Sequence, residues 1–114
     1  MNIVKLQEAG INYEEGLKRF SNKAELYEKY LVKFFSDPLF AELGNYISEK
    51  NYTEAFKCAH TLKGLSGNLS ITGLYKYISV MVEALRNNET ASVDEMYDEL
   101  TKIYNNVRLA VLQS

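Results

Sequence analysis

Apolar side chains recur three and four residues apart over most of the chain, which is the spacing that places them on one face of an α-helix. No convincing alternation of apolar and polar residues, as in a strand, competes with this pattern, so we expect an all-α fold. A weaker N-terminal region comes first, in pieces separated by Gly10 and Gly16. The main helices are predicted near residues 23–35, 38–49, 52–69, 73–87 and 92–112.

Residues that commonly cap helices stand where these segments begin. The predicted starts are Asn22, Asp37 followed by Pro38, Asn51, Thr72 and Ser92. Asn22, Asn51 and Ser92 each have a glutamate three residues later, as in a capping box. The polar stretch 87–91 predicts a loop between the last two helices.

Each main segment carries a stripe of apolar residues, which is typical of a helix face buried in a core. The stripes contain Tyr27, Tyr30, Leu31 and Phe34; Leu39, Leu43, Tyr46 and Ile47; Leu74, Ile78, Met81, Val82 and Leu85; and Val93, Met96, Leu100, Ile103 and Val107. With short connections between the segments, they predict an antiparallel four-helix bundle with an additional N-terminal helix or helices. A length of 114 residues suits one domain, residues 1–114.

The segment 52–69 has two different faces when each residue is turned by about 100° from the last. Ala55, Cys58, Leu62, Leu65 and Leu69 lie opposite His60 and are predicted to form its core stripe. His60 must then point outward, on a face whose other residues are Thr53, Phe56, Lys57, Lys63, Gly64 and Gly67. Each glycine costs about 0.8–1 kcal/mol inside a helix relative to alanine. Their position therefore suggests that a partner must approach His60 closely, and the predicted exposed Phe56 favours a protein partner.

Composition excludes several classes of function. A net charge of −2 gives no basic field for nucleic acid or anionic lipid, and no apolar run approaches a membrane span or signal peptide. We therefore expect a cytoplasmic monomer. Cys58 is the single cysteine, so it cannot form an internal disulfide. Cys58 also lies about 200° from His60 around the helix, and no second histidine is present, so we expect no metal site. No GxxxxGK[ST] loop is present, so we expect no cofactor and no ATP site.

A neutral imidazole can accept a phosphoryl group on a ring nitrogen, and a nearby ammonium such as that of Lys63 stabilises the charge on phosphoryl oxygens. The run AHTLKG at residues 59–64, continued by GNL at 67–69, resembles the signature of histidine-phosphotransfer domains. The segments 16–35 and 82–88 are also similar to the family pattern. Two positions depart from it: Leu65 stands where a small residue is common, and Ser70 where glycine is common.

The resemblance implies a role for three residues: His60 is phosphorylated, Lys63 contacts the phosphoryl group, and Gly64 leaves room for a receiver domain. It further implies response-regulator receiver domains, a hybrid histidine kinase, or both as partners. From their position around His60 on the helix, Phe56, Lys57 and Gly67 are predicted to lie at the docking face. The receiver supplies its own Mg²⁺. A chemotaxis-type kinase domain could instead phosphorylate His60 directly. From a different class, the chain could be a helical module that docks on a receiver or kinase and inhibits it, without using His60.

Overall fold

The computed structural model describes residues 1–113, and every regular element in this range is an α-helix. Three helices come first: α1 (Ile3–Glu8), α2 (Tyr13–Arg19) and α3 (Ala24–Phe34). Four helices follow: α4 (Leu39–Ser48), α5 (Tyr52–Asn68), α6 (Thr72–Arg86) and α7 (Val93–Leu112). The prediction of an all-α fold is confirmed, and each of the five main helices begins and ends within a residue of its predicted bounds.

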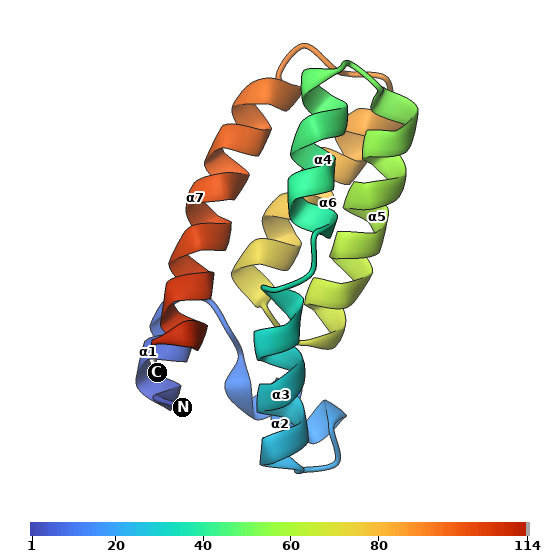
Figure 1. The fold of residues 1–114 in the computed structure, drawn as a ribbon. Helices are drawn as coiled ribbons and strands as arrows, with labels where there is room; N and C mark the ends of the chain where they lie inside the picture. Colours follow the sequence, from blue (N-terminus) through green and yellow to red (C-terminus); the bar gives the residue numbers. More distant parts are fainter. Residues whose placement is uncertain (114) are drawn as a thin grey trace.

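The helices α4 to α7 lie side by side along the long axis of the molecule, and each runs in the opposite direction to the one before it (Figure 1). α5 packs against both α4 and α6, and α7 packs against α6 and α4. α3 continues below α4, while α1 and α2 lie at the end where α7 finishes (Figure 1). The molecule measures 40 × 23 × 20 Å.

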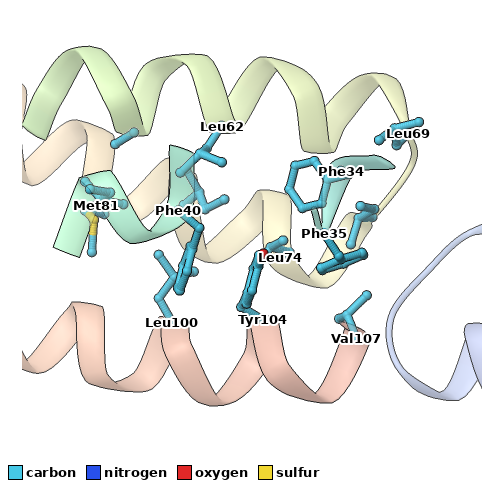
Figure 2. Packing of buried hydrophobic residues seen from close by; sticks show 14 of the residues in the cluster. Phe34, Phe35, Phe40, Leu62, Leu69, Leu74, Met81, Leu100, Tyr104 and Val107 are labelled. Carbon is cyan, nitrogen blue, oxygen red and sulfur yellow. The ribbon is translucent and has the colours of Figure 1, made fainter. Parts of the chain in front are cut away.

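The core between these helices combines leucine side chains with a group of aromatic rings (Figure 2). Phe40 and Tyr104 stack with ring centroids 3.9 Å apart, and Phe35 packs on the same tyrosine at 5.1 Å. Aromatic pairs of this kind stabilise a core beyond the area that they bury. They join α4 and the end of α3 to α7, and thereby hold α3 on the helices α4 to α7.

Two residues predicted to be buried are exposed. Leu65 on α5 and Tyr30 on α3 have exposed fractions of 37% and 40%. Both residues line a shared hollow between α3 and α5, so neither is covered by the core. The core side of α5 instead includes Ala59 and Ser66, both fully buried, and the Ser66 hydroxyl donates to the carbonyl of Lys63 at 3.1 Å.

The interpretation of Gly16 as a break between N-terminal segments was wrong. Gly16 lies inside α2, where a Cβ atom would come within 2.1 Å of the Tyr27 hydroxyl oxygen. Glycine is therefore required by close packing of α2 on α3. Gly10 does separate α1 from α2. Its φ is 97°, a value that residues other than glycine rarely adopt.

The predicted caps had mixed outcomes. Asn51 caps α5, since its Oδ1 accepts from the amide of Glu54 at 3.4 Å, and Asp37 Oδ1 accepts from the amide of Leu39 at 2.9 Å at the start of α4. Asn22 does not cap α3: it has a φ of 61°, and its amide donates to Leu17 as α2 ends. Ser92 precedes α7, but its side chain makes no capping hydrogen bond.

Candidate functional site

α5 is held at both ends by local backbone chemistry. The Asn51 cap fixes its start, and at its end the amides of Ser70 and Ile71 donate to the carbonyls of Gly67 and Ser66. This pairing is the Schellman arrangement, which needs a residue with positive φ, and Ser70 supplies it at 54°. The helix therefore runs without interruption through the segment that contains His60, despite two glycines.

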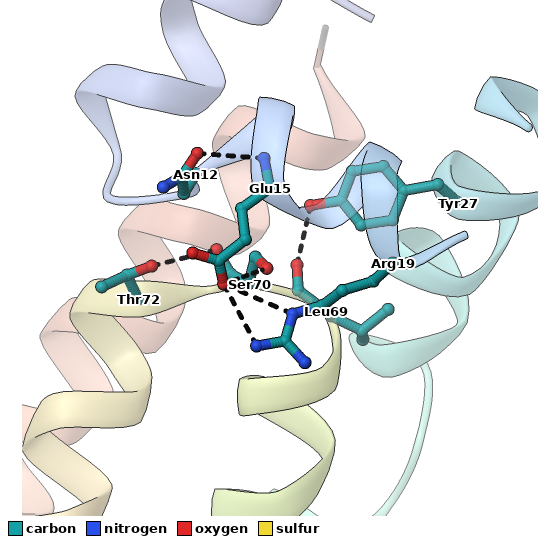
Figure 3. A network of polar contacts seen from close by, with 7 residues as sticks. All are labelled: Asn12, Glu15, Arg19, Tyr27, Leu69, Ser70 and Thr72. Carbon is teal, nitrogen blue, oxygen red and sulfur yellow. Dashed lines mark hydrogen bonds and ion pairs between the residues drawn. The ribbon is translucent and has the colours of Figure 1, made fainter. Parts of the chain in front are cut away.

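The end of α5 is also fixed by contacts from the N-terminal helices (Figure 3). The Tyr27 hydroxyl donates to the carbonyl of Leu69 at 2.7 Å, and the buried Ser70 hydroxyl donates to Glu15 Oε1 at 2.9 Å. Arg19 donates to the same carboxylate oxygen at 3.3 Å. The backbone amide of Asn12 donates to the carbonyl of Ser70 at 2.9 Å. These bonds fix the turn between α5 and α6, and thereby how the two helices face one another.

His60 lies on the exposed side of α5, as predicted. Its ring is 5.9 Å from that of Phe56, one turn earlier, with the planes tilted by 34°. Phe56 is half-buried, and the guanidinium of Arg86 on α6 lies 5.5 Å from its ring centroid. Arg86 also pairs with Glu83. The predicted exposure of Phe56 is therefore only partial, because α6 covers one side of it.

Lys63 lies one turn beyond His60 and turns toward α6. Its side chain is half-buried, and its ammonium lies 6.0 Å from the centroid of the Tyr75 ring. No carboxylate within residues 1–113 lies within ion-pair distance of Lys63. Lys57, on the other flank of His60, is exposed and pairs with Glu54 at 3.4 Å.

Gly64 and Gly67 have different surroundings. A Cβ atom at Gly64 would meet nothing within 4 Å, so the surface one turn from His60 is open. A Cβ atom at Gly67 would lie 3.1 Å from the Tyr75 ring, so this glycine allows α6 to pack closely on α5. The sequence interpretation that both glycines clear an exposed surface thus describes Gly64, whereas Gly67 has a packing partner.

A hollow of about 470 Å³ opens between α5 and α6 beside this face. Its charged lining residues are Arg19 and Glu15 from α2, Lys63 from α5 and Lys76 from α6. Three cations therefore accompany one carboxylate, in a protein whose net charge is −2. This local excess of positive charge favours an anion next to the helix that carries His60.

Cys58 is separated from this surface. It is buried, and burial raises the pKa of its thiol, so the reactive thiolate is disfavoured. Within residues 1–113, no three side chains of the His, Cys, Asp and Glu types lie together in a group that could hold a metal ion. In the same range, no helix is long and apolar enough to cross a membrane.

None of the four residues His60, Phe56, Lys63 and Gly64 on α5 is buried, and two residues of α6 that sequence reasoning missed lie beside Lys63 and Phe56. The Tyr75 ring lies 6.0 Å from the Lys63 ammonium and the Arg86 guanidinium lies 5.5 Å from the Phe56 ring, although these pairs are 12 and 30 positions apart in the sequence. Their position depends on how α6 packs on α5, which no local pattern reveals. Comparison of the chain with models of protein families, with curated proteins and with solved structures finds no match.

Proposed function

We propose that this protein carries a phosphoryl group on His60, as a histidine-phosphotransfer domain of a two-component phosphorelay. The observation that carries the proposal is an exposed imidazole beside an open glycine: nothing lies within 4 Å of where a Gly64 side chain would begin. A helix surface gains stability from almost any other residue at that position. Clearance for an approaching protein gives a reason for glycine there.

The transfer needs little from the carrier. A ring nitrogen of neutral His60 attacks the phosphorus of an aspartyl phosphate on the receiver, and the aspartate carboxylate leaves with the electron pair of the broken O–P bond. An N–P bond forms, while the other ring nitrogen keeps its proton. The ammonium of Lys63 stabilises the negative charge that spreads over the phosphoryl oxygens. Transfer to a second receiver is the reverse of these steps.

Phe56 and Lys57 flank His60 on the side of the N-terminus of α5, and we propose that a receiver domain docks over them and over Gly64. The partial exposure of Phe56 and the exposure of Lys57 support this placement. The proposed partners are response-regulator receivers, a hybrid histidine kinase, or both, with Mg²⁺ bound by the receiver. This chain would then act without a cofactor or an ATP site, as a cytoplasmic monomer.

At the level of architecture, we propose that α4 to α7 form the antiparallel four-helix bundle of the histidine-phosphotransfer family, with α1 to α3 as N-terminal additions in one domain. Packing of α5 against α4 and α6, and of α7 against α6 and α4, supports this proposal. In such a bundle a middle helix can present a reactive side chain outward while its opposite face fills the core.

Incubation with a panel of phosphorylated receiver domains tests the function. The purified protein should acquire phosphate that is labile in acid and stable in base, as expected for phosphohistidine, and His60→Gln should remain unlabelled. Because His60 is exposed, this variant should melt at nearly the wild-type temperature. A protein that binds receivers tightly but never acquires phosphate would be an inhibitory docking module. Acid-labile labelling of His60→Gln would refute the assignment of the residue.

A further inference from the structure

The packing of α6 on α5 places one aromatic ring beside Lys63. Tyr75 Cδ2 and Cε2 lie 3.1 Å from the position of a Cβ atom at Gly67, so the ring rests against the backbone of α5. Any larger residue at Gly67 would push the ring away. Tyr75 is 37% exposed, so the side chain is not enclosed and remains available to a neighbouring side chain.

The Lys63 ammonium occupies that neighbouring position. It lies 6.0 Å from the ring centroid, at the outer limit of a cation–π contact, and no carboxylate of residues 1–113 pairs with it. A lysine side chain is a flexible chain of four carbons, and it samples many conformations when no contact holds it. The half-burial of Lys63 and the nearness of its ammonium to Tyr75 favour conformations on the side of α5 that faces α6.

We infer that Tyr75 is a positioning residue that holds the Lys63 ammonium ready for the phosphoryl group on His60, an inference that rests on the proposed function. Gly67 belongs to the same arrangement, since its missing side chain admits the ring. Tyr75 itself need not touch the phosphoryl group. The effect of Tyr75 on transfer is exerted through Lys63.

An aromatic ring suits this purpose better than a carboxylate. A carboxylate would hold the ammonium more firmly, but it would also neutralise the charge that stabilises the phosphoryl oxygens. The face of a tyrosine ring attracts a cation weakly through its quadrupole and carries no net charge. The ammonium is thus confined, keeps its full positive charge, and can move to the phosphoryl group at small cost.

Transfer rates test the inference with matched variants. Tyr75→Leu should slow transfer from a phosphorylated receiver about two- to fivefold, whereas Tyr75→Phe, which keeps the ring, should transfer at the wild-type rate. Lys63→Ala/Tyr75→Leu should be no slower than Lys63→Ala alone, because the two residues act in one step. Additive losses, or an unchanged rate in Tyr75→Leu, would overturn the inference. Faster transfer in Tyr75→Leu would also overturn it, by showing that the ring holds Lys63 away from His60.

An NMR measurement reads the contact without any phosphoryl transfer. The ring current of Tyr75 should shift the terminal methylene protons of Lys63, and this shift should persist in Tyr75→Phe and disappear in Tyr75→Leu. Lys33 offers an internal control: its ammonium lies 5.7 Å from the Tyr30 ring, and its signals should be the same in all variants. If the Lys63 methylene shift were unchanged in Tyr75→Leu while His60 was still labelled, the inference would be overturned and the proposed function would stand. Absence of His60 labelling with the NMR response intact would instead overturn the proposed function, and with it the role of Tyr75 in transfer.

Discussion

At the scale of single residues, Gly64 and Gly67 allow two reasons for glycine to be separated within one helix. Both lie on α5 less than one turn apart, but Gly64 faces open space and Gly67 faces the ring of Tyr75. A glycine that leaves room for a partner lowers the stability of the free protein. A glycine that allows a ring to pack against the helix regains part of that stability through the contact.

The first prediction concerns the stability of two matched variants. Gly64→Ala should raise the free energy of unfolding by about 0.5–1 kcal/mol, because alanine is the better helix former and its methyl group meets nothing. Gly67→Ala should gain less, since the Tyr75 ring must shift by a few tenths of an ångström. Urea denaturation of both variants would measure the difference, and an equal or larger gain at Gly67 would contradict it.

The second prediction concerns transfer at Gly64. Gly64→Gln should melt at or above the wild-type temperature, yet transfer from a receiver should fall about 10- to 100-fold, because the new side chain occupies space that the receiver needs. Gly64→Ala should lose less, and labelling by phosphoramidate, which needs little clearance, should survive in both. Wild-type transfer by Gly64→Gln would refute the clearance argument. Unfolding of this variant would show that Gly64 has a packing role.

At the scale of elements, the short N-terminal helices determine how α5 and α6 meet. Besides the bonds from Tyr27 and Asn12 to the α5–α6 turn, the amide of Gly73 at the start of α6 donates to the carbonyl of Gly10 at 3.1 Å. These contacts link residues about 40 to 60 positions apart and satisfy backbone groups that a turn leaves unpaired. The helices α1 to α3 therefore contribute to the geometry of the site, although His60 and Lys63 both lie on α5.

The third prediction tests this link at Gly16. A methyl group there would come within 2.1 Å of the Tyr27 hydroxyl, on a side chain that is fully buried. Gly16→Ala should therefore move the ring, weaken the hydrogen bond to Leu69 and lower the free energy of unfolding by about 1–3 kcal/mol. Gly64→Ala, the same substitution in an open site, is the control and should have the opposite sign. A Gly16→Ala protein as stable as wild type would show that the ring can shift at no cost.

At the scale of the whole molecule, buried tyrosines make the fold sensitive to high pH. Burial and the hydrogen bond to Glu28 raise the pKa of Tyr13 to about 12, from 10.0, and burial raises the pKa of Tyr27, Tyr97 and Tyr104. A phenol that stays protonated in the folded state loses its proton more easily in the unfolded state. The contribution of these phenols to the free energy of unfolding is therefore fully present below pH 10 and is lost as the pH rises from 10 toward 12.

The fourth prediction follows from that sign. The urea midpoint should decline steadily between pH 10 and pH 11.5, and Tyr13→Phe should reduce the slope because it removes one of the groups responsible. The Tyr13 hydroxyl donates to Glu28 at 2.6 Å, so this variant should also lose some stability at neutral pH. A midpoint that does not change up to pH 11.5 would show that these phenols ionise equally well in both states.

The sequence by itself determined the helices and the outward direction of His60. Both depend on local properties: a period of 3.6 residues, a few capping side chains and the rotation from one residue to the next. These act within a few positions of the chain, so the five main helices were predicted to within a residue and His60 was placed correctly opposite Cys58 and Leu62.

Only the tertiary structure decided which residues meet across helices. It exposed Leu65, which the periodic pattern placed on the core side of α5, and it buried Ser66, because burial depends on how neighbouring helices pack. It placed Tyr75 against Gly67 and Lys63, and Tyr27 against Gly16. Such contacts depend on the packing of segments against one another, and a single sequence contains no local signal for that geometry.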